Sequence, residues 1–328
     1  GHGFTDSMYG APWAVASVFA SRGIATLAIN VVGHGGGPLG TLTVLRSGAT
    51  PVVVSAGGRG FDQDGNGTID STEGVNAAPP RTVIGSRDGL RQTVVDLMQL
   101  VREVEVGMDV DGDGTPDLDA QRIYYAGQSF GGIYGTIFLG VEPSLKAGVP
   151  NVPGGSITEI ARLGAFRPLT GIALISRLPS LINVSPNPSG IEFNENMPLR
   201  NEPPRINNVA GAMAIQQLLD RNEWVQQSGN PVSYAERIRK NPLPGHAAKP
   251  VLIQFANRSC SVLVATDVAA RGLDIDQLEA VINVDVTPDP EIHIHRIGRT
   301  GRGDEEGWAL SLCSSGDRRR AATLAEMM

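Results

Sequence analysis

The sequence predicts an α/β fold with a mostly parallel sheet and a helical cap. Residues 123–128 read as a short apolar strand that runs into Gly-Gln-Ser-Phe-Gly at 127–131 and then into a helix-compatible stretch. Residues 14–35 follow a similar order, because a predicted helix leads through a glycine to an apolar strand and Gly-His-Gly. The 328 residues are 41% hydrophobic with a net charge of −7, an ordinary soluble profile with no global basic bias towards nucleic acid.

The pattern Gly-x-Ser-x-Gly at 127–131 is the sequence of a nucleophile elbow. In this turn a serine is held between a strand and a helix, so that its hydroxyl stands clear of the sheet. Gly127 and Gly131 are needed because side chains there would clash where strand and helix approach. A small-residue turn has the same composition, but the flanking strand and helix favour the elbow. The context therefore predicts Ser129 as a nucleophile.

The elements before this serine alternate between helix and strand. Residues 24–30 predict a buried strand, and the loop after it contains His34. Residues 36–84 form a glycine-rich excursion with a predicted hairpin, whose strands are centred on 42–44 and 52–54. Residues 88–106 show helical spacing of apolar side chains, so we expect a helix there that covers one face of the sheet.

The elements after the serine predict a cap. Residues 145–150 are expected to form the next strand. Residues 151–245 are rich in proline and asparagine, and 212–219 read as one of several short helices. An insertion here is either a cap that sets substrate shape over the serine or an irregular surface segment. Residues 249–256 then predict another buried strand.

Two acidic runs have the spacing of calcium loops. Residues 62–73 match the twelve-position pattern, with Gly67 at the turn, and the second run, at 109–119, begins in the same way. The second run has Ala120 where the bidentate glutamate would stand. An acidic solvated turn is the alternative reading of each run. The sequence thus predicts structural Ca²⁺ and no organic cofactor, with these ligands: Asp62, Asp64, Asn66, Thr68, Asp70 and Glu73 in the first loop, and Asp109, Asp111, Asp113, Thr115 and Asp117 in the second.

Membrane segments and disulfides are not expected. No run of about 18 apolar residues occurs, so the sequence predicts no transmembrane helix. No signal peptide is visible, although the first residue is not methionine. The two cysteines, Cys260 and Cys313, give no disulfide framework.

Residues 1–256 resemble the α/β-hydrolase family of serine esterases and lipases, and are most similar to bacterial secreted esterases, some of which act on polyesters. The resemblance rests on the elbow at 127–131, on His2-Gly3-Phe4 and on the order of the elements. It implies that Ser129 is the nucleophile and that the N–H groups of Phe4 and Phe130 form the oxyanion hole; a glycine-rich tail is the alternative for the first residues.

The same resemblance carries four further expectations. It implies a sheet that is N-terminally incomplete, because the strand expected before His2 is not in the sequence, and a secreted or periplasmic location for the hydrolase body. His34 is expected to be a loop residue, since the family supplies its histidine after the serine. An acid is expected just beyond residue 256, but Asn257-Arg258-Ser259-Cys260 offers no carboxylate there.

The C-terminal residues resemble a different family. The runs Val-Leu-Val-Ala-Thr-Asp-Val-Ala-Ala-Arg-Gly-Leu-Asp at 262–274 and His-Ile-His-Arg-Ile-Gly-Arg-Thr-Gly-Arg at 293–302 resemble the second RecA-like domain of DEAD-box RNA helicases. In that family Asp274, Arg299 and Arg302 would face ATP phosphates, and Thr266 and Arg271 would lie near the RNA backbone. The chain has no Gly-x-x-x-x-Gly-Lys-Ser/Thr loop, so we expect no ATP-driven unwinding. Such a tail would be cytoplasmic, and nucleic acid is not the expected partner of an acidic chain.

The two resemblances meet at residues 251–256, which suit a strand in either family. We therefore expect a hydrolase body at 1–256 with its cap at about 151–245, fused to a fragment of a RecA-like α/β domain at 257–328. A fusion at a short shared sequence can arise when DNA from mixed sources is cloned or assembled. A natural two-domain protein is the alternative.

A serine nucleophile needs a base, and the base needs an orienting carboxylate. The C-terminal region contains Asp267, then His293 and His295, in the order that the hydrolase family uses, and His246 is a further option. The leading prediction is a carboxylic ester hydrolase that forms an acyl-enzyme on a small-molecule or polymeric ester. A catalytically impaired chimera and an RNA-binding helicase fragment without ATPase activity are the alternatives.

Overall fold

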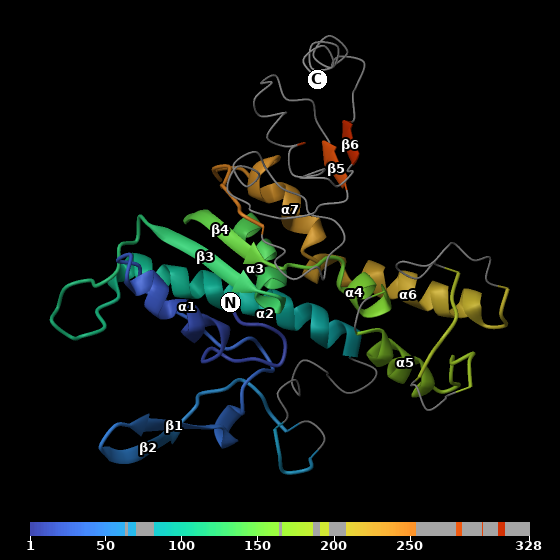
Figure 1. Ribbon diagram of the computed structural model, residues 1–328, viewed down its shortest axis with the longest axis horizontal. Coiled ribbons are helices and arrows are strands. Elements are labelled where there is room, and N and C mark those ends of the chain that lie inside the picture. Colours follow the sequence, from blue (N-terminus) through green and yellow to red (C-terminus); the bar gives the residue numbers. More distant parts are fainter. Residues whose placement is uncertain are drawn as a thin grey trace, which may run out of the picture. The chain divides into compact units, whose positions relative to one another are not determined.

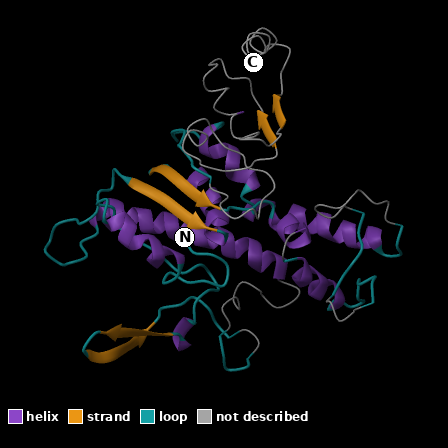
Figure 2. Cartoon of the chain, in the orientation of Figure 1, coloured by secondary structure: helices purple, strands orange, loops and turns teal. Residues whose placement is uncertain are grey.

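The chain divides into two compact units, Gly1–Pro250 and Val251–Met328. A computed structural model describes residues 1–62, 65–69, 82–163, 166–185, 191–196, 208–253, 280–283, 297 and 308–311. The described part of the second unit holds β5 (Ala280–Asn283) and β6 (Trp308–Ser311), which pair in parallel. Most of the described structure is the first unit, which mixes helices with two short sheets (Figures 1 and 2).

The parallel strands of the first unit are β3 (Ile123–Gln128) and β4 (Leu145–Asn151), and α3 (Phe130–Val141) connects them. The backbone of Gly1 also pairs with β3, because its nitrogen donates to Ala126 O (2.7 Å) and its carbonyl accepts from Gln128 N (3.1 Å). This pattern is that of a parallel bridge. It places residues 1–4 beside the strand that leads to Ser129.

Two helices build the core around these strands. α3 is buried from Phe130 to Gly140, because it packs against β3, β4, α2 and α7 (Val232–Arg239). α2 (Thr82–Gly107) buries an apolar face that includes Leu90, Val94 and Val101. The helix predicted at 88–106 is therefore confirmed, and it begins earlier than the periodicity indicated.

The buried strand predicted at residues 24–30 is wrong. After α1 (Ala11–Ala20) the segment forms no ladder with any described strand, and Ile24 and Leu27 are 41% and 43% exposed. A strand is stabilised by cross-strand partners, and an apolar run alone does not supply them. Of the strand predicted at 249–256, the described part reaches residue 253 and forms only a bridge at Val251, while residues 254–256 lie outside the described residues.

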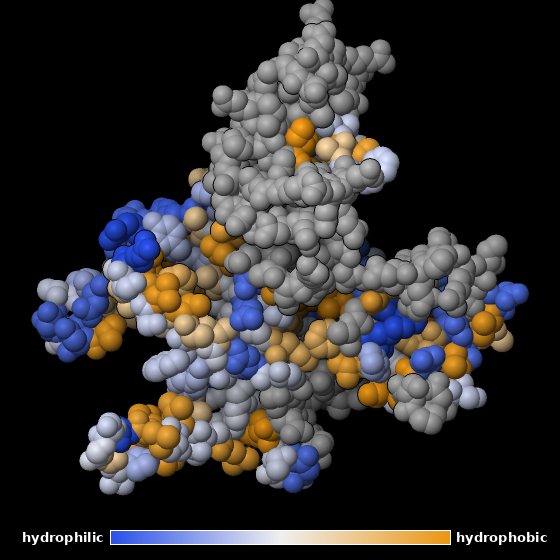
Figure 3. Space-filling model, in the orientation of Figure 1, coloured by the Kyte–Doolittle hydropathy of each residue, from blue (hydrophilic) through white to orange (hydrophobic). Residues whose placement is uncertain are grey.

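The predicted hairpin is present but projects from the first unit. β1 (Thr41–Arg46) and β2 (Ala49–Ser55) pair in antiparallel fashion. Their side chains are exposed or nearly so, including the apolar Leu45, Val53 and Val54, and they form an orange patch over the hairpin in Figure 3. The helix α1 and the short 3₁₀ helix Gly37–Leu39 precede the hairpin.

The described parts of the segment after β4, where the sequence predicts a cap, include several helices. The segment contains α4 (Ile157–Leu163), α5 (Arg167–Ile175) and α6 (Ala212–Gln226), followed by the short 3₁₀ helix Gln227–Gly229. α5 and α6 share a small apolar core with Phe193, and in it Leu174 and Ile215 are almost fully buried. Among the described residues, no helix combines the length and the apolar character that crossing a membrane needs.

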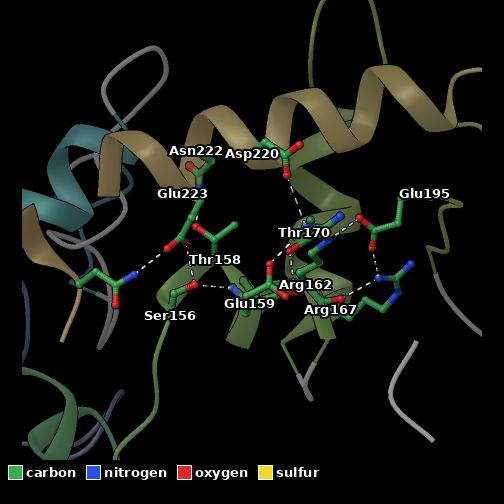
Figure 4. A network of polar contacts seen from close by, with 12 residues as sticks. Ser156, Thr158, Glu159, Arg162, Arg167, Thr170, Glu195, Asp220, Asn222 and Glu223 are labelled. Carbon is green, nitrogen blue, oxygen red and sulfur yellow. Dashed lines mark hydrogen bonds and ion pairs between the residues drawn. The ribbon is translucent and has the colours of Figure 1, made fainter. Parts of the chain in front are cut away.

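An ion-pair network centred on the buried Arg162 and Glu195 holds α4, α5 and α6 together (Figure 4). Arg162 of α4 donates through Nε to Glu195 Oε2 (2.5 Å), and Arg167 of α5 donates through Nη1 to Glu195 Oε1 (3.0 Å). Arg162 also pairs with Glu159 of its own helix (3.2 Å) and with Asp220 of α6 (3.8 Å). The network therefore joins three helices to the segment at 191–196.

Candidate nucleophile and oxyanion site

Ser129 occupies the sharp turn between β3 and α3. Its backbone has φ 54° and ψ −113°, a conformation that residues other than glycine rarely adopt. The Ser129 N–H donates to Asn151 O (2.9 Å), and the Ser129 carbonyl accepts from Ile133 N (3.0 Å). The backbone of Ser129 is thus anchored to β4 and α3, while the residue as a whole is exposed.

The two glycines of the motif have the steric role that the sequence predicts. A Cβ built on Gly127 would lie 2.4 Å from the carbonyl oxygen of Gly131. A Cβ built on Gly131 would lie 2.4 Å from the carbonyl oxygen of Gly1. Both distances are far below van der Waals contact, so only glycine lets strand, turn and N-terminal segment pack this closely.

The predicted oxyanion donors lie beside the serine. A Cβ built on Gly3 would be 3.7 Å from Ser129 Cβ, and the Phe4 and Phe130 rings meet edge to face at 5.6 Å. Within the part of the chain that the structure describes, neither the Phe4 N–H nor the Phe130 N–H donates to a protein acceptor. Free backbone N–H groups next to a nucleophile are the donors that a developing oxyanion requires.

Two buried imidazoles, His2 and His34, pack behind these donors. The His34 ring stacks on the Phe130 ring, with 5.6 Å between centroids, and lies 5.3 Å from the His2 ring. Burial lowers the pKa of His2 to about 4 and also lowers the pKa of His34. His34 follows a turn as expected, but its ring supports Phe130, a contact that the sequence did not indicate. No role of its own was predicted for the His2 ring. Its position directly before Gly3-Phe4 was the signal that could have indicated one.

The acid and base predicted for Ser129 are not placed by the structure. Asp267, His293 and His295 lie outside the described residues, as do Thr266, Arg271, Asp274, Arg299 and Arg302 of the helicase-like runs. His246 lies in a turn where its N–H donates to Leu243 O (2.9 Å). Among the described residues, no histidine forms a hydrogen bond with the Ser129 hydroxyl.

The second acidic loop gathers carboxylates. Carboxylate oxygens of Asp109, Asp111 and Asp117 lie within 4.8 Å of one another. The hydroxyl and backbone N–H of Thr115 both donate to the Asp113 carboxylate and lower its pKa. The structure therefore brings together three of the five predicted ligands, and their hard oxygen atoms suit Ca²⁺.

The first acidic loop has the same turn. Asp62 Oδ1 accepts from the N–H groups three and four residues later, and Oδ2 accepts from the N–H five residues later. Asp109 accepts at the same three offsets in the second loop. Asn66 accepts from the N–H and hydroxyl of Thr68, as Asp113 does from Thr115. Asp64, Asp70 and Glu73 lie outside the described residues.

Comparison with known proteins shows which family the C-terminal region is similar to. Residues 242–304 match the family described as the helicase conserved C-terminal domain. The ATP-dependent RNA helicase DbpA of Escherichia coli is 53% identical over 77 residues, which cover 24% of this chain and 17% of DbpA. The ATP-dependent RNA helicase DDX42 of Homo sapiens is 51% identical over 74 residues, or 23% of this chain and 8% of DDX42. The chain thus spans less than a fifth of the length of these relatives.

One solved structure covers most of the chain at low similarity. The crystal structure of acetyl xylan esterase 1 from Thermoanaerobacterium sp. JW/SL YS485 matches 98% of this chain and 71% of its own, with 14% identity and a TM-score of 0.37. Values this low assign neither fold nor function. The family match begins at residue 242, upstream of the boundary predicted after residue 256. What the comparisons establish is a helicase-like C-terminal region, in which residues 242–304 are similar to the helicase conserved C-terminal domain.

Proposed function

We propose that the first unit is a carboxylic ester hydrolase with Ser129 as its nucleophile. The observation that carries this proposal is the geometry of Ser129, which is exposed at φ 54° between β3 and α3 and lies beside two N–H groups that have no protein acceptor among the described residues. Ser129 Oγ would attack the ester carbonyl and pass its proton to a base, and the Phe4 and Phe130 N–H groups would bind the oxyanion. The base would then protonate the departing alcohol, and water would release the acid from the acyl-enzyme.

For the base we propose His293 or His295, oriented by Asp267, with His246 as the alternative. If none of these histidines reaches Ser129, the chain would be a catalytically impaired chimera, joined near residues 251–256. A second candidate function is RNA binding by the C-terminal region without ATP hydrolysis, and the family match at 242–304 favours it.

For the substrate we propose an ester with an apolar acyl or polymer chain. The Phe166 ring of the cap meets the Phe4 ring edge to face at 5.9 Å, which links α5 to the oxyanion segment. Phe166, Leu169 and Ile172 are all exposed, and their spacing places them on one side of α5. An apolar surface on this side of α5 would favour burial of an apolar chain over a polar one.

A fluorophosphonate probe, which labels nucleophilic serines, tests the proposal. We expect the probe to label the wild-type chain but not Ser129→Ala. The matched control is Ser21→Ala, which removes an exposed serine hydroxyl elsewhere in the unit, and we expect this variant to be labelled like the wild type. Labelling rates of His293→Ala, His295→Ala and His246→Ala then identify the base, since loss of the true base slows attack by about 10²-fold or more. The rate of Asp267→Ala tests the orienting carboxylate. Absence of labelling in folded wild-type protein contradicts the proposal. RNA-stimulated ATP hydrolysis would instead favour a helicase activity.

We also propose that both acidic loops bind structural Ca²⁺. The oxygens of Asp109, Asp111 and Asp117 would supply ligands in the second loop, and the first loop would act through Asp62 and its predicted partners. Ca²⁺ at a hundred times its dissociation constant is expected to raise the free energy of unfolding by about 2.7 kcal/mol. Thermal melting with Ca²⁺, with Mg²⁺ and with a chelator measures this difference.

The matched variants for this experiment are Asp109→Asn and Asp119→Asn. Asp119 lies in the same loop but accepts from Gln121 N and Arg122 and is not part of the carboxylate cluster. Asp109→Asn is therefore expected to reduce the Ca²⁺-dependent rise, and Asp119→Asn to preserve it. Melting of the wild type that does not change with a chelator would show that the runs are acidic solvated turns.

A further inference from the structure

We infer that His2 is a positioning residue for the proposed reaction, because its ring fixes the Gly3–Phe4 peptide and thereby aims the Phe4 N–H at the oxyanion site. The inference rests on the proposed function. It goes beyond that function by assigning a role to a buried side chain that does not touch the substrate.

The two partners of the His2 ring determine which nitrogen carries the proton. Val31 N donates to His2 Nε2 at 2.9 Å, and a backbone N–H can only donate. Nε2 must therefore present its lone pair, so the neutral ring carries its proton on Nδ1. His2 Nδ1 lies 2.9 Å from Gly3 O, and this proton is thus donated to the Gly3 carbonyl.

Holding the Gly3 carbonyl orients the Phe4 N–H, because both belong to one planar trans peptide in which C=O and N–H point in opposite directions. The Gly3 oxygen also accepts from Asp6 N (3.3 Å), so it is held from two directions on the side away from the Phe4 N–H. Gly3 itself lies beside Ser129, at 3.7 Å from a built Cβ to Ser129 Cβ. The geometry directs the unpaired N–H away from the His2 ring and leaves it free for an oxyanion.

The surroundings of His2 keep this arrangement across the neutral pH range. The ring is fully buried, and its titratable neighbours are His34, Asp6 and the Gly1 amino group. Burial is the main cause that lowers the His2 pKa to about 4, while Asp6 opposes the effect and His34 adds to it. The ring therefore stays neutral above about pH 5, and Nε2 continues to accept from Val31.

Two amide variants separate the two bonds of the ring. In His2→Asn the amide group is close to the position of Nδ1 and still donates to Gly3 O, but nothing accepts from Val31. In His2→Gln the amide oxygen reaches the position of Nε2 and accepts from Val31, but the donor to Gly3 O is lost. Each variant removes one hydrogen bond, so both are expected to lose similar stability.

The kinetic result distinguishes positioning from a structural role. His2→Gln is expected to lower kcat for ester hydrolysis by about 10²-fold with little change in KM, because the oxyanion donor is misaligned. His2→Asn is expected to lose clearly less kcat. If kcat fell equally in the two variants, or fell only as far as their losses of stability explain, the inference would be overturned. The proposed serine hydrolase itself would remain intact.

Two further readouts do not depend on activity. Two-bond ¹H–¹⁵N spectra of the His2 ring are expected to show protonated Nδ1 and unprotonated Nε2 from pH 8 to pH 5, and a protonated Nε2 would contradict the inference. The unfolded chain binds a proton at His2 near pH 6.5 and the folded chain only near pH 4, so stability should fall as the pH drops between these values. The lowered pKa of His34 acts in the same direction. The free energy of unfolding of His2→Asn should change less with pH than that of the wild type, and the difference between the two slopes is the contribution of His2.

If the wild-type chain shows no labelling by fluorophosphonate, the proposed hydrolase fails, and the catalytic meaning of His2 fails with it. If labelling occurs but His2→Gln and His2→Asn behave alike, only the positioning role fails. The two failures are therefore distinguishable.

Discussion

Gly131→Ala is expected to lower the free energy of unfolding of the first unit by about 3 kcal/mol or more and to abolish labelling of Ser129. The new methyl group would lie 2.4 Å from the Gly1 carbonyl oxygen, 2.5 Å from its carbon and 3.0 Å from His2 O. All three are backbone atoms, and the Gly1 backbone is also hydrogen-bonded to β3. The clash can be relieved only by moving residues 1–4 away from the strand. Urea unfolding of the full chain, followed by far-ultraviolet circular dichroism, measures the loss.

The matched control is Gly89→Ala, another glycine-to-alanine change in a helix. A Cβ at Gly89 would make an ordinary contact with Val32, at 3.8 Å from its nearest atom. Since alanine is a better helix former than glycine, this variant is expected to gain about 0.5–1 kcal/mol. If both variants changed stability in the same direction and by the same amount, the close approach of the N-terminal segment to the elbow would be refuted.

Arg162→Met is expected to cost about 3–5 kcal/mol, because it leaves a buried carboxylate without its strongest partner. The Arg162 side chain is 2% exposed and the Glu195 side chain 1%, and the two meet at 2.5 Å (Figure 4). Arg167 still donates to Glu195 in this variant, so we expect a value near the lower end of the range. Thermal and urea unfolding give the difference in stability.

Arg122→Ala is the matched control for this ion pair. Arg122 meets Asp119 at 2.6 Å, but its side chain is 71% exposed, so its loss is expected to cost less than about 1 kcal/mol. A second change, Glu195→Gln in the Arg162→Met background, is expected to recover part of the loss, since it removes the charge of a buried carboxylate that has lost Arg162. Equal costs for Arg162→Met and Arg122→Ala would mean that the packing of α4, α5 and α6 does not depend on the buried network.

Local patterns in the sequence predicted the elements whose structure is locally determined. The spacing of Leu90, Val94 and Val101 was sufficient for α2, because an amphipathic helix satisfies its own backbone hydrogen bonds. Gly127 and Gly131 predicted the turn at Ser129 only together with the apolar strand before them and the helix-compatible stretch after them. Residues 24–30 failed as a strand because a strand needs a partner, and the sequence of one segment does not show whether the partner is there.

The parts that the sequence did not predict depend on contacts between distant segments. Arg162 lies in α4 and Glu195 lies 33 residues later, beyond α5, and neither residue has a neighbouring pattern that indicates burial. The His2 ring bonds to Val31, which follows a segment that was itself mispredicted. The calcium spacing could be recognised because all ligands of a loop are close in sequence, but Ca²⁺ binding, like the acid and base for Ser129, remains a prediction.

The backbone of Ser129 has a consequence for engineering. A serine at φ 54° is strained by about 1–3 kcal/mol relative to a glycine, which adopts such angles freely. Selection for heat tolerance alone would therefore favour glycine at position 129, and the most stable variants of this chain would be the ones that had lost the hydroxyl. A thermostabilisation campaign that aims to keep the proposed nucleophile must hold position 129 invariant, and it must score fluorophosphonate labelling of Ser129 together with melting temperature.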